Sequence, residues 1–119
     1  MSMESLIVGV LDPLVAGKCW PDVGPDAPTL PYITYQQVGG DAINFITGGQ
    51  PSKANARVQV NVWAATRMQA KALAQQAETA LRGVAALQTE VLGAPSSTYD
   101  DVTKYRGTIQ FFSCWTDVA

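Results

Sequence analysis

The stretch from Asn55 to Gly83 constrains the fold more than any other part of this 119-residue chain, because its hydrophobic period changes halfway along. In the first half, Val58, Val60 and Val62 fall on one face and alternate with residues of the other face, which include Trp63. A period of two in a run rich in β-branched residues is typical of a half-buried strand. We therefore expect a strand over 55–64.

The second half of the same stretch has the period of a helix. Thr66 is suited to cap the helix, Gln69 can reach back to the cap, and Gly83 is suited to end the helix. Apolar residues recur at helical spacing between them, and the predicted buried face is Met68, Ala72, Leu73, Ala77, Ala80, Leu81 and Val84. A strand that leads directly into an amphipathic helix is the unit around which the remaining elements must pack.

The rest of the chain supplies a shorter helix and further strands. A helix that begins at Ser2 or Ser5 is expected to end at Leu11, with Asp12 as the cap of a brief turn that begins at Pro13. The remaining expected strands are 18–21, 32–38, 42–47, 86–92 and 105–115, and 21–31 and 94–101 are expected to be loops. The order is helix, four strands, helix, two strands. It predicts an α+β fold, an antiparallel or mixed sheet packed by two α-helices, in a single domain over 1–119.

Composition places the chain among globular proteins with few surface charges. Hydrophobic residues make up 47% and charged residues 15% of the sequence. Cys19 and Cys114 both fall in expected strands, so reduced, structural thiols are favoured over a disulfide. The apolar run from Leu6 to Leu11 has no basic residue before it and is too short for a signal-peptide core or a membrane span. Synthesis in the cytoplasm without membrane association is therefore expected.

The net charge of −2 conceals an uneven distribution of acidic and basic residues along the chain. Residues 1–50 are net acidic, residues 51–82 are net basic, and the remainder is again net acidic. An acidic total argues against direct binding of nucleic acid, which needs a basic footprint. Opposed patches can instead steer one copy of a protein onto another, although the same charges can simply solvate a helix and loops.

The sequence offers no recognisable catalytic, cofactor or metal site. It contains no histidine, which removes the commonest general base and metal ligand near neutral pH. Two pairs of acidic residues lack the spacing of a calcium loop: Asp100 with Asp101, and Asp22 with Asp26. The glycines near Lys18 lack the spacing of a phosphate loop. We therefore expect a protein that is not an enzyme, with no catalytic, cofactor-binding or metal-binding residues. An enzyme that uses a carboxylate pair is the least favoured alternative.

Aromatic side chains support a second class of function. Trp63 and neighbouring aromatics, among them Trp20, Tyr32, Tyr35 and Trp115, would line a ligand pocket in a small α+β binding or regulatory module acting as a dimer. Aromatic residues at strand positions are, however, usually core, and no basic residues interleave with them as on a nucleic-acid platform.

A specific resemblance favours another function. The sequence resembles the tail-completion family of long-tailed bacteriophages and prophages in two segments. The first is 30–33 (Leu-Pro-Tyr-Ile) with Gln37 after it, and the second is 56–64 (ARVQVNVWA), which Thr66 and an alanine-rich helix follow. The opening apolar helix, the Asp12-Pro13 step and the proline-rich loop before Leu30 agree as well, so the resemblance covers about 5–115. It is a pattern of structural residues and contains no catalytic signature.

The resemblance implies a structural minor tail protein that caps the head-proximal end of the tail tube and enables head–tail joining. It also implies a ring, hexameric to match the tube, with the tail tube protein and head-completion or connector proteins as partners, in a virion assembled in the bacterial cytoplasm. No contact residues transfer by motif. From the sequence itself we expect interface residues in an arm and in the 94–101 loop: Asn44, Phe45, Ile46, Ser97, Tyr99 and Asp100.

Overall fold

The computed structural model describes residues 3–22, 24–25, 28–42, 46, 48–49 and 52–117. Two α-helices, two short 3-10 helices and six strands make up the fold. In chain order they are α1 (Met3–Leu11), η1 (Asp12–Val15), β1 (Cys19–Pro21), β2 (Tyr32–Gln37), β3 (Lys53–Ala64), α2 (Arg67–Arg82), η2 (Ala85–Leu87), β4 (Glu90–Val91), β5 (Ser96–Tyr99) and β6 (Arg106–Asp117).

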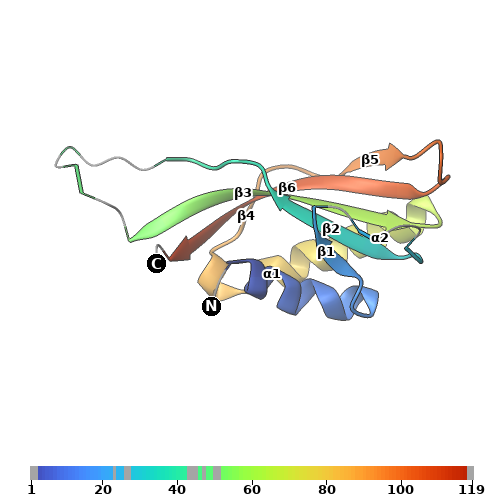
Figure 1. Ribbon diagram of the computed structural model, residues 1–119, viewed down its shortest axis with the longest axis horizontal. Helices are drawn as coiled ribbons and strands as arrows, with labels where there is room; N and C mark the ends of the chain where they lie inside the picture. Colours follow the sequence, from blue (N-terminus) through green and yellow to red (C-terminus); the bar gives the residue numbers. More distant parts are fainter. Residues whose placement is uncertain are drawn as a thin grey trace.

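The six strands form one mixed sheet, and both helices lie on the same face of it (Figure 1). The strand order is β1-β2-β3-β6-β4, and β5 also pairs with β6, at residues 106–109, whereas β4 pairs with it at 112–113. The pair β1–β2 is parallel and the other pairs are antiparallel. The predicted α+β class, a mixed sheet packed by two helices, is therefore confirmed, and neither of the described helices covers the second face of the sheet.

The core lies between the sheet and the helices. Val58, Val60 and Val62 of β3 are almost fully buried there, as the period of two predicts. Phe112 of β6 lies between β3 and β4 and is also fully buried. Both cysteines are buried in this layer and free, in agreement with the prediction of reduced, structural thiols.

The caps of α2 match the prediction, but its buried face is rotated from the predicted one. Thr66 accepts a hydrogen bond from the N–H of Gln69 at 3.1 Å, and Gly83 ends the helix. Met68 and Ala72, which were expected to be inside, are exposed. The buried residues are Ala70, Leu73, Ala74, Ala77 and Leu81. Because alanines occupy many positions of α2, two neighbouring faces of the helix have similar hydrophobicity. Packing against the core buries the face that includes Leu73 and Leu81.

Three local predictions were wrong. Asp12 does not cap the turn that follows α1, since its carboxylate accepts the N–H of Cys19 at 3.2 Å and Leu11 holds the cap position. The expected strand over 86–92 is a 3-10 turn and a two-residue strand, because Leu87 enters the core from the turn. The expected loop over 94–101 contains β5, whose polar, mostly exposed residues give no hydrophobic alternation.

The expected strand over 42–47 lies mostly outside the described residues; of those that are described, Ala42 is coil and Ile46 is in a turn.

Candidate interaction surface

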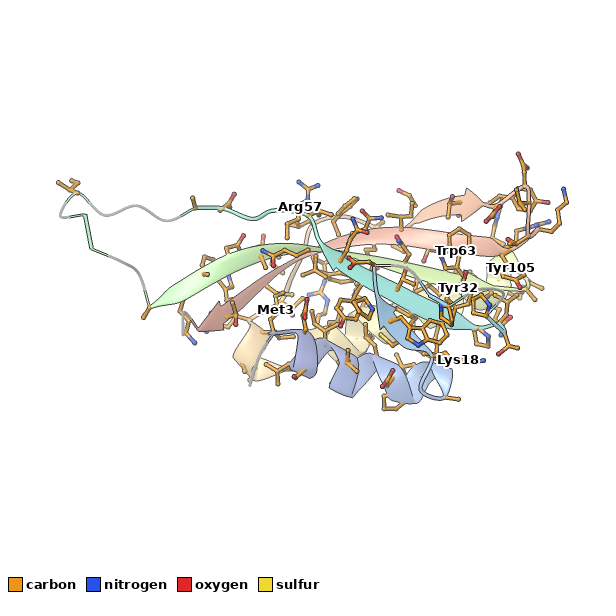
Figure 2. The ribbon with its side chains drawn as sticks, viewed as in Figure 1. Met3, Lys18, Tyr32, Arg57, Trp63 and Tyr105 are labelled. Carbon is orange, nitrogen blue, oxygen red and sulfur yellow. The ribbon has the colours of Figure 1, made fainter. Side chains whose placement is uncertain are left out.

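The sheet face that carries no helix is the largest feature left open by the fold, and we call it the open face. On β3 it is formed by the residues between the buried valines, namely Arg57, Gln59, Asn61 and Trp63. On β6 the residues between the buried positions are Ile109, Phe111, Ser113 and Trp115. Figure 2 shows Arg57 and Trp63 on the side of the sheet away from the helices. The open face therefore mixes aromatic, amide and charged groups, as surfaces that contact other proteins commonly do.

One end of the open face is an aromatic cluster. The rings of Trp20 and Tyr32 lie 5.8 Å apart, and those of Tyr32 and Tyr105 lie 6.3 Å apart in an edge-on arrangement (Figure 2). The Tyr105 hydroxyl donates a hydrogen bond to the carbonyl of Pro28 at 3.3 Å. Burial, followed by the proximity of Tyr105 and Asp100, raises the pKa of Tyr32. The cluster thus fixes the proline-rich connection between β1 and β2 against the sheet.

A hollow of about 330 Å³ lies beside this cluster. Trp63, Asn61 and Thr34 form its floor, and Asp22, Gly24, Pro25 and Pro28 contribute from the connection between β1 and β2. The structure thus places Trp63 at a hollow, where the hypothesis of a small binding module requires it. Its volume is at the lower limit of small-molecule sites.

A larger hollow of about 500 Å³ lies where the chain leaves β2 toward β3, and we call it the Arg57 hollow. The Arg57 guanidinium stacks over the ring of Phe111, with its central carbon 4.7 Å from the ring centroid. Within the described part of the chain, Arg57 forms no salt bridge. The other lining residues are Val38, Gly39, Gly40, Asp41, Asn55, Leu92 and Ser113. A positioned, unpaired guanidinium beside apolar surface is suited to bind a carboxylate of another molecule.

The wall of the Arg57 hollow is held by a network around Asn55. Its amide nitrogen donates to the Ser113 hydroxyl at 2.6 Å, and its amide oxygen accepts the N–H of Asp41 at 2.9 Å. Gly40 has a φ of +152° and lies directly against the backbone of Asn55, where a Cβ atom would overlap the carbonyl oxygen. A glycine is therefore required there, and the hollow has a pre-formed wall.

The structure does not bring the two predicted interface regions together. Residues 39–42 lead from β2 toward one end of the molecule, and the β5–β6 turn lies at the other end (Figure 1). Ile46 is fully exposed, whereas Asn44 and Phe45 lie outside the described residues. Ser97 and Tyr99 are exposed on β5, and the Tyr99 ring stacks against Arg106, whose guanidinium carbon is 4.2 Å from the ring centroid.

Asp100 organises the β5–β6 turn. Its carboxylate accepts the N–H groups of Val102 at 2.9 Å and Thr103 at 3.4 Å, and its backbone carbonyl accepts the N–H of Lys104 at 2.7 Å. The hydrogen bond from Val102 is the largest cause that lowers the pKa of Asp100. Asp100 is thus a structural residue of the turn, and the groups that the turn presents to solvent are its neighbours Asp101 and Val102.

Sequence reasoning missed the pairing of Arg57 with Phe111 and the roles of Leu92 and Val102. The adjacent glycines 39 and 40 signalled a turn, but the proximity of Leu92 to Arg57 depends on both strands pairing with β6. In the part of the chain that the structure describes, no three acidic or cysteine side chains lie together as metal ligands. None of the described helices is long and apolar enough to cross a membrane.

Comparison with known proteins gives a matching family and solved structures of similar fold. Residues 9–116 match the profile of the family described as tail completion protein gp17. A chain of the solved structure titled as the virion of the native gene transfer agent particle superposes with a TM-score of 0.55 at 15% identity. The superposition covers 98% of this chain and 96% of that chain, which shows a shared fold. No curated protein matches the sequence.

Proposed function

Because this chain belongs to the tail completion protein family and is therefore a structural component of a phage tail, we propose that it caps the head-proximal end of the tail tube and enables the tail to join the head. The observation that carries the proposal is the family match, which spans residues 9–116 and therefore nearly the whole fold. The likeness of its fold, over 98% of the chain, to a chain of a virion supports the same conclusion.

The working form in this proposal is a ring of identical copies, hexameric to match the tube. A ring needs two different surfaces on each copy, because a head-to-tail contact closes only when unlike surfaces meet. The chain has unlike regions of this kind: a net acidic first part, a net basic central part, and an open sheet face with residues 39–42 and the β5–β6 turn toward opposite ends. Its proposed partners are the tail tube protein on one side of the ring and the head-completion or connector proteins on the other.

The same proposal assigns no catalysis, cofactor or direct contact with nucleic acid. The chain would act in the virion tail after assembly in the cytoplasm of the bacterial host. Contact residues are proposed in the arm, at Asn44, Phe45 and Ile46, and around β5, at Ser97, Tyr99 and Asp100. Of these residues, Ile46 is exposed, and Ser97 and Tyr99 are exposed on β5.

The position of the chain in the particle tests the proposal. A short epitope tag on the C-terminus, in complemented particles, should place gold-labelled antibody at the junction of head and tail in electron micrographs. Label along the whole tube would assign the chain to the tube, and label at the distal tip would assign it to the tip. Either result would contradict a role at the head-proximal end.

A second candidate function rests on the hollow of about 330 Å³ beside Trp63. In this alternative the chain is a small ligand-binding or regulatory module that acts as a dimer. Tryptophan fluorescence of the purified chain should then change on addition of a fragment library, and Trp63→Phe should abolish the change. A dimer with no tail phenotype would favour this alternative, whereas unchanged fluorescence would remove it.

A further inference from the structure

The β5–β6 turn presents three exposed side chains. Val102 is 90% exposed, and its neighbour Asp101 and the nearby Lys104 are exposed as well. Within the described part of the chain, the Asp101 carboxylate takes part in no hydrogen bond or salt bridge. Asp100 fixes the backbone of the turn through the N–H groups of Val102 and Thr103. The turn is therefore a pre-organised tip that carries one acid, one base and one valine.

The Arg57 hollow offers the complementary set. Arg57 and Asp41 supply one base and one acid at its rim, and Leu92, which is 46% exposed, supplies an apolar wall. Its volume of about 500 Å³ exceeds that of a single side chain. Stacking on Phe111 positions the guanidinium in advance, so less side-chain freedom is lost when a carboxylate binds.

One copy cannot place its own tip in its own hollow. The turn precedes Arg106, whereas the Leu92 N–H donates to the carbonyl of Phe111, five residues further along β6. At about 3.3 Å per residue of strand, these two points lie roughly 16 Å apart. Arg57 pairs with Ser113, two residues further still. The tip and the hollow are therefore separate surfaces, which two copies can join.

We propose that the Arg57 hollow receives the β5–β6 turn of a neighbouring copy. Val102 packs against Leu92, the Asp101 carboxylate binds the Arg57 guanidinium, and the Lys104 ammonium pairs with Asp41. This assignment rests on the proposed ring and names the two surfaces that meet at each contact. Since each copy uses unlike surfaces, the contact propagates from copy to copy and can close into a ring.

Site-directed cross-linking tests the contact directly. Purified Leu92→Cys and Val102→Cys variants, each with a different tag, are mixed and oxidised, and the same pair is co-expressed in particles. The proposal predicts a heterodimer in both preparations, since a disulfide requires Cα atoms within about 7 Å. Thr79→Cys, on the exposed side of α2, replaces Leu92→Cys in the control mixture. The native thiols are buried, and the wild-type chain measures their background.

Charge reversal then tests the assigned salt bridge. Introducing Arg57→Asp into the Leu92→Cys chain, or Asp101→Arg into the Val102→Cys chain, should lower the heterodimer yield several-fold. Combining both reversals should restore it, which no unrelated structural damage would do. Cross-linking no faster than the Thr79→Cys control in both preparations would overturn the proposal, as would a combined reversal that stays as low as the single ones. The position of gold label is a separate readout, so failure of the tail function and failure of this contact remain distinguishable.

Discussion

Phe111 and Phe112 are neighbours on β6, yet they belong to opposite faces of the sheet. Phe112 is fully buried beneath the helices, whereas Phe111 is half-buried on the open face and supports the Arg57 guanidinium. The same amino acid therefore serves the stability of the fold on one face and the shape of a surface on the other. The difference shows that this sheet separates folding from interaction by alternation along each long strand.

The largest expected effect comes from truncating these two residues in parallel. Phe112→Ala should lower the free energy of unfolding by about 3–5 kcal/mol, because it removes a fully buried ring and leaves a cavity. Phe111→Ala should cost much less, since its ring is only half-buried on the open face, beneath the Arg57 guanidinium. Urea denaturation followed by circular dichroism measures both. Equal losses would contradict the separation of the two faces.

Two glutamines give a smaller contrast. Gln110 is buried, and its amide donates to the Glu78 carboxylate at 2.9 Å and to the Gly93 carbonyl at 3.0 Å. Gln110→Ala should cost about 1–3 kcal/mol, because it removes both hydrogen bonds of a buried amide, one of them to a carboxylate. Gln59→Ala on the open face removes a hydrogen bond to Asn61 and should stay within about 0.5 kcal/mol of the wild type. Equal effects in urea denaturation would count against the comparison.

A buried hydroxyl offers a change of opposite sign. Thr108 Oγ1 is buried on the covered face and has no hydrogen-bond partner among the described residues. Thr108→Val keeps the shape and should raise the free energy of unfolding by about 1 kcal/mol, because an unpaired polar atom leaves the core. Thr98→Val, on the exposed strand β5, is the matched control and should change little. Destabilisation by Thr108→Val would mean that the hydroxyl is satisfied in solution.

A dependence of stability on alkaline pH is also expected. Burial, followed by the nearby Asp12 carboxylate, raises the pKa of Cys19 from 9.0 to about 12. The folded chain therefore keeps a proton that the unfolded chain releases, so stability is complete below pH 9 and falls from pH 9 toward pH 12. Part of this fall should disappear in Cys19→Ala when urea midpoints are compared across the range. An identical pH profile in the variant would contradict the assignment.

The sequence predicts the covered face far better than the open one. Alternating valines on β3 and the capped helix after Thr66 are local signals, and both elements form as expected. The strand β5 escaped detection because its segment SSTY takes its structure from pairing with β6 rather than from hydrophobic alternation. Likewise, the Arg57 hollow depends on register between β3, β6 and the residues after β4, and no local pattern encodes that register.

The alanine-rich helix α2 illustrates a third kind of limit. Met68 has a larger hydrophobic side chain than Ala70 or Ala74, yet it lies on the exposed side near the start of the helix. The two small alanines are the buried residues. Close approach of the helix to the strands favours small residues, and hydrophobicity alone does not express that steric requirement. Of the predicted interface residues, Ile46, Ser97 and Tyr99 are exposed in the structure, and their contacts stay predictions.

Deletion of the gene tests the central claim most directly. Lysates from the deletion strain and from the complemented strain would be compared by electron microscopy. We expect the deletion to yield filled heads separate from tails, with free or overlong tails, and complementation to restore joined particles. Overlong tails would indicate a role in ending tube growth, and tails of normal length a role in joining. Normal, infectious particles without the gene would contradict the account.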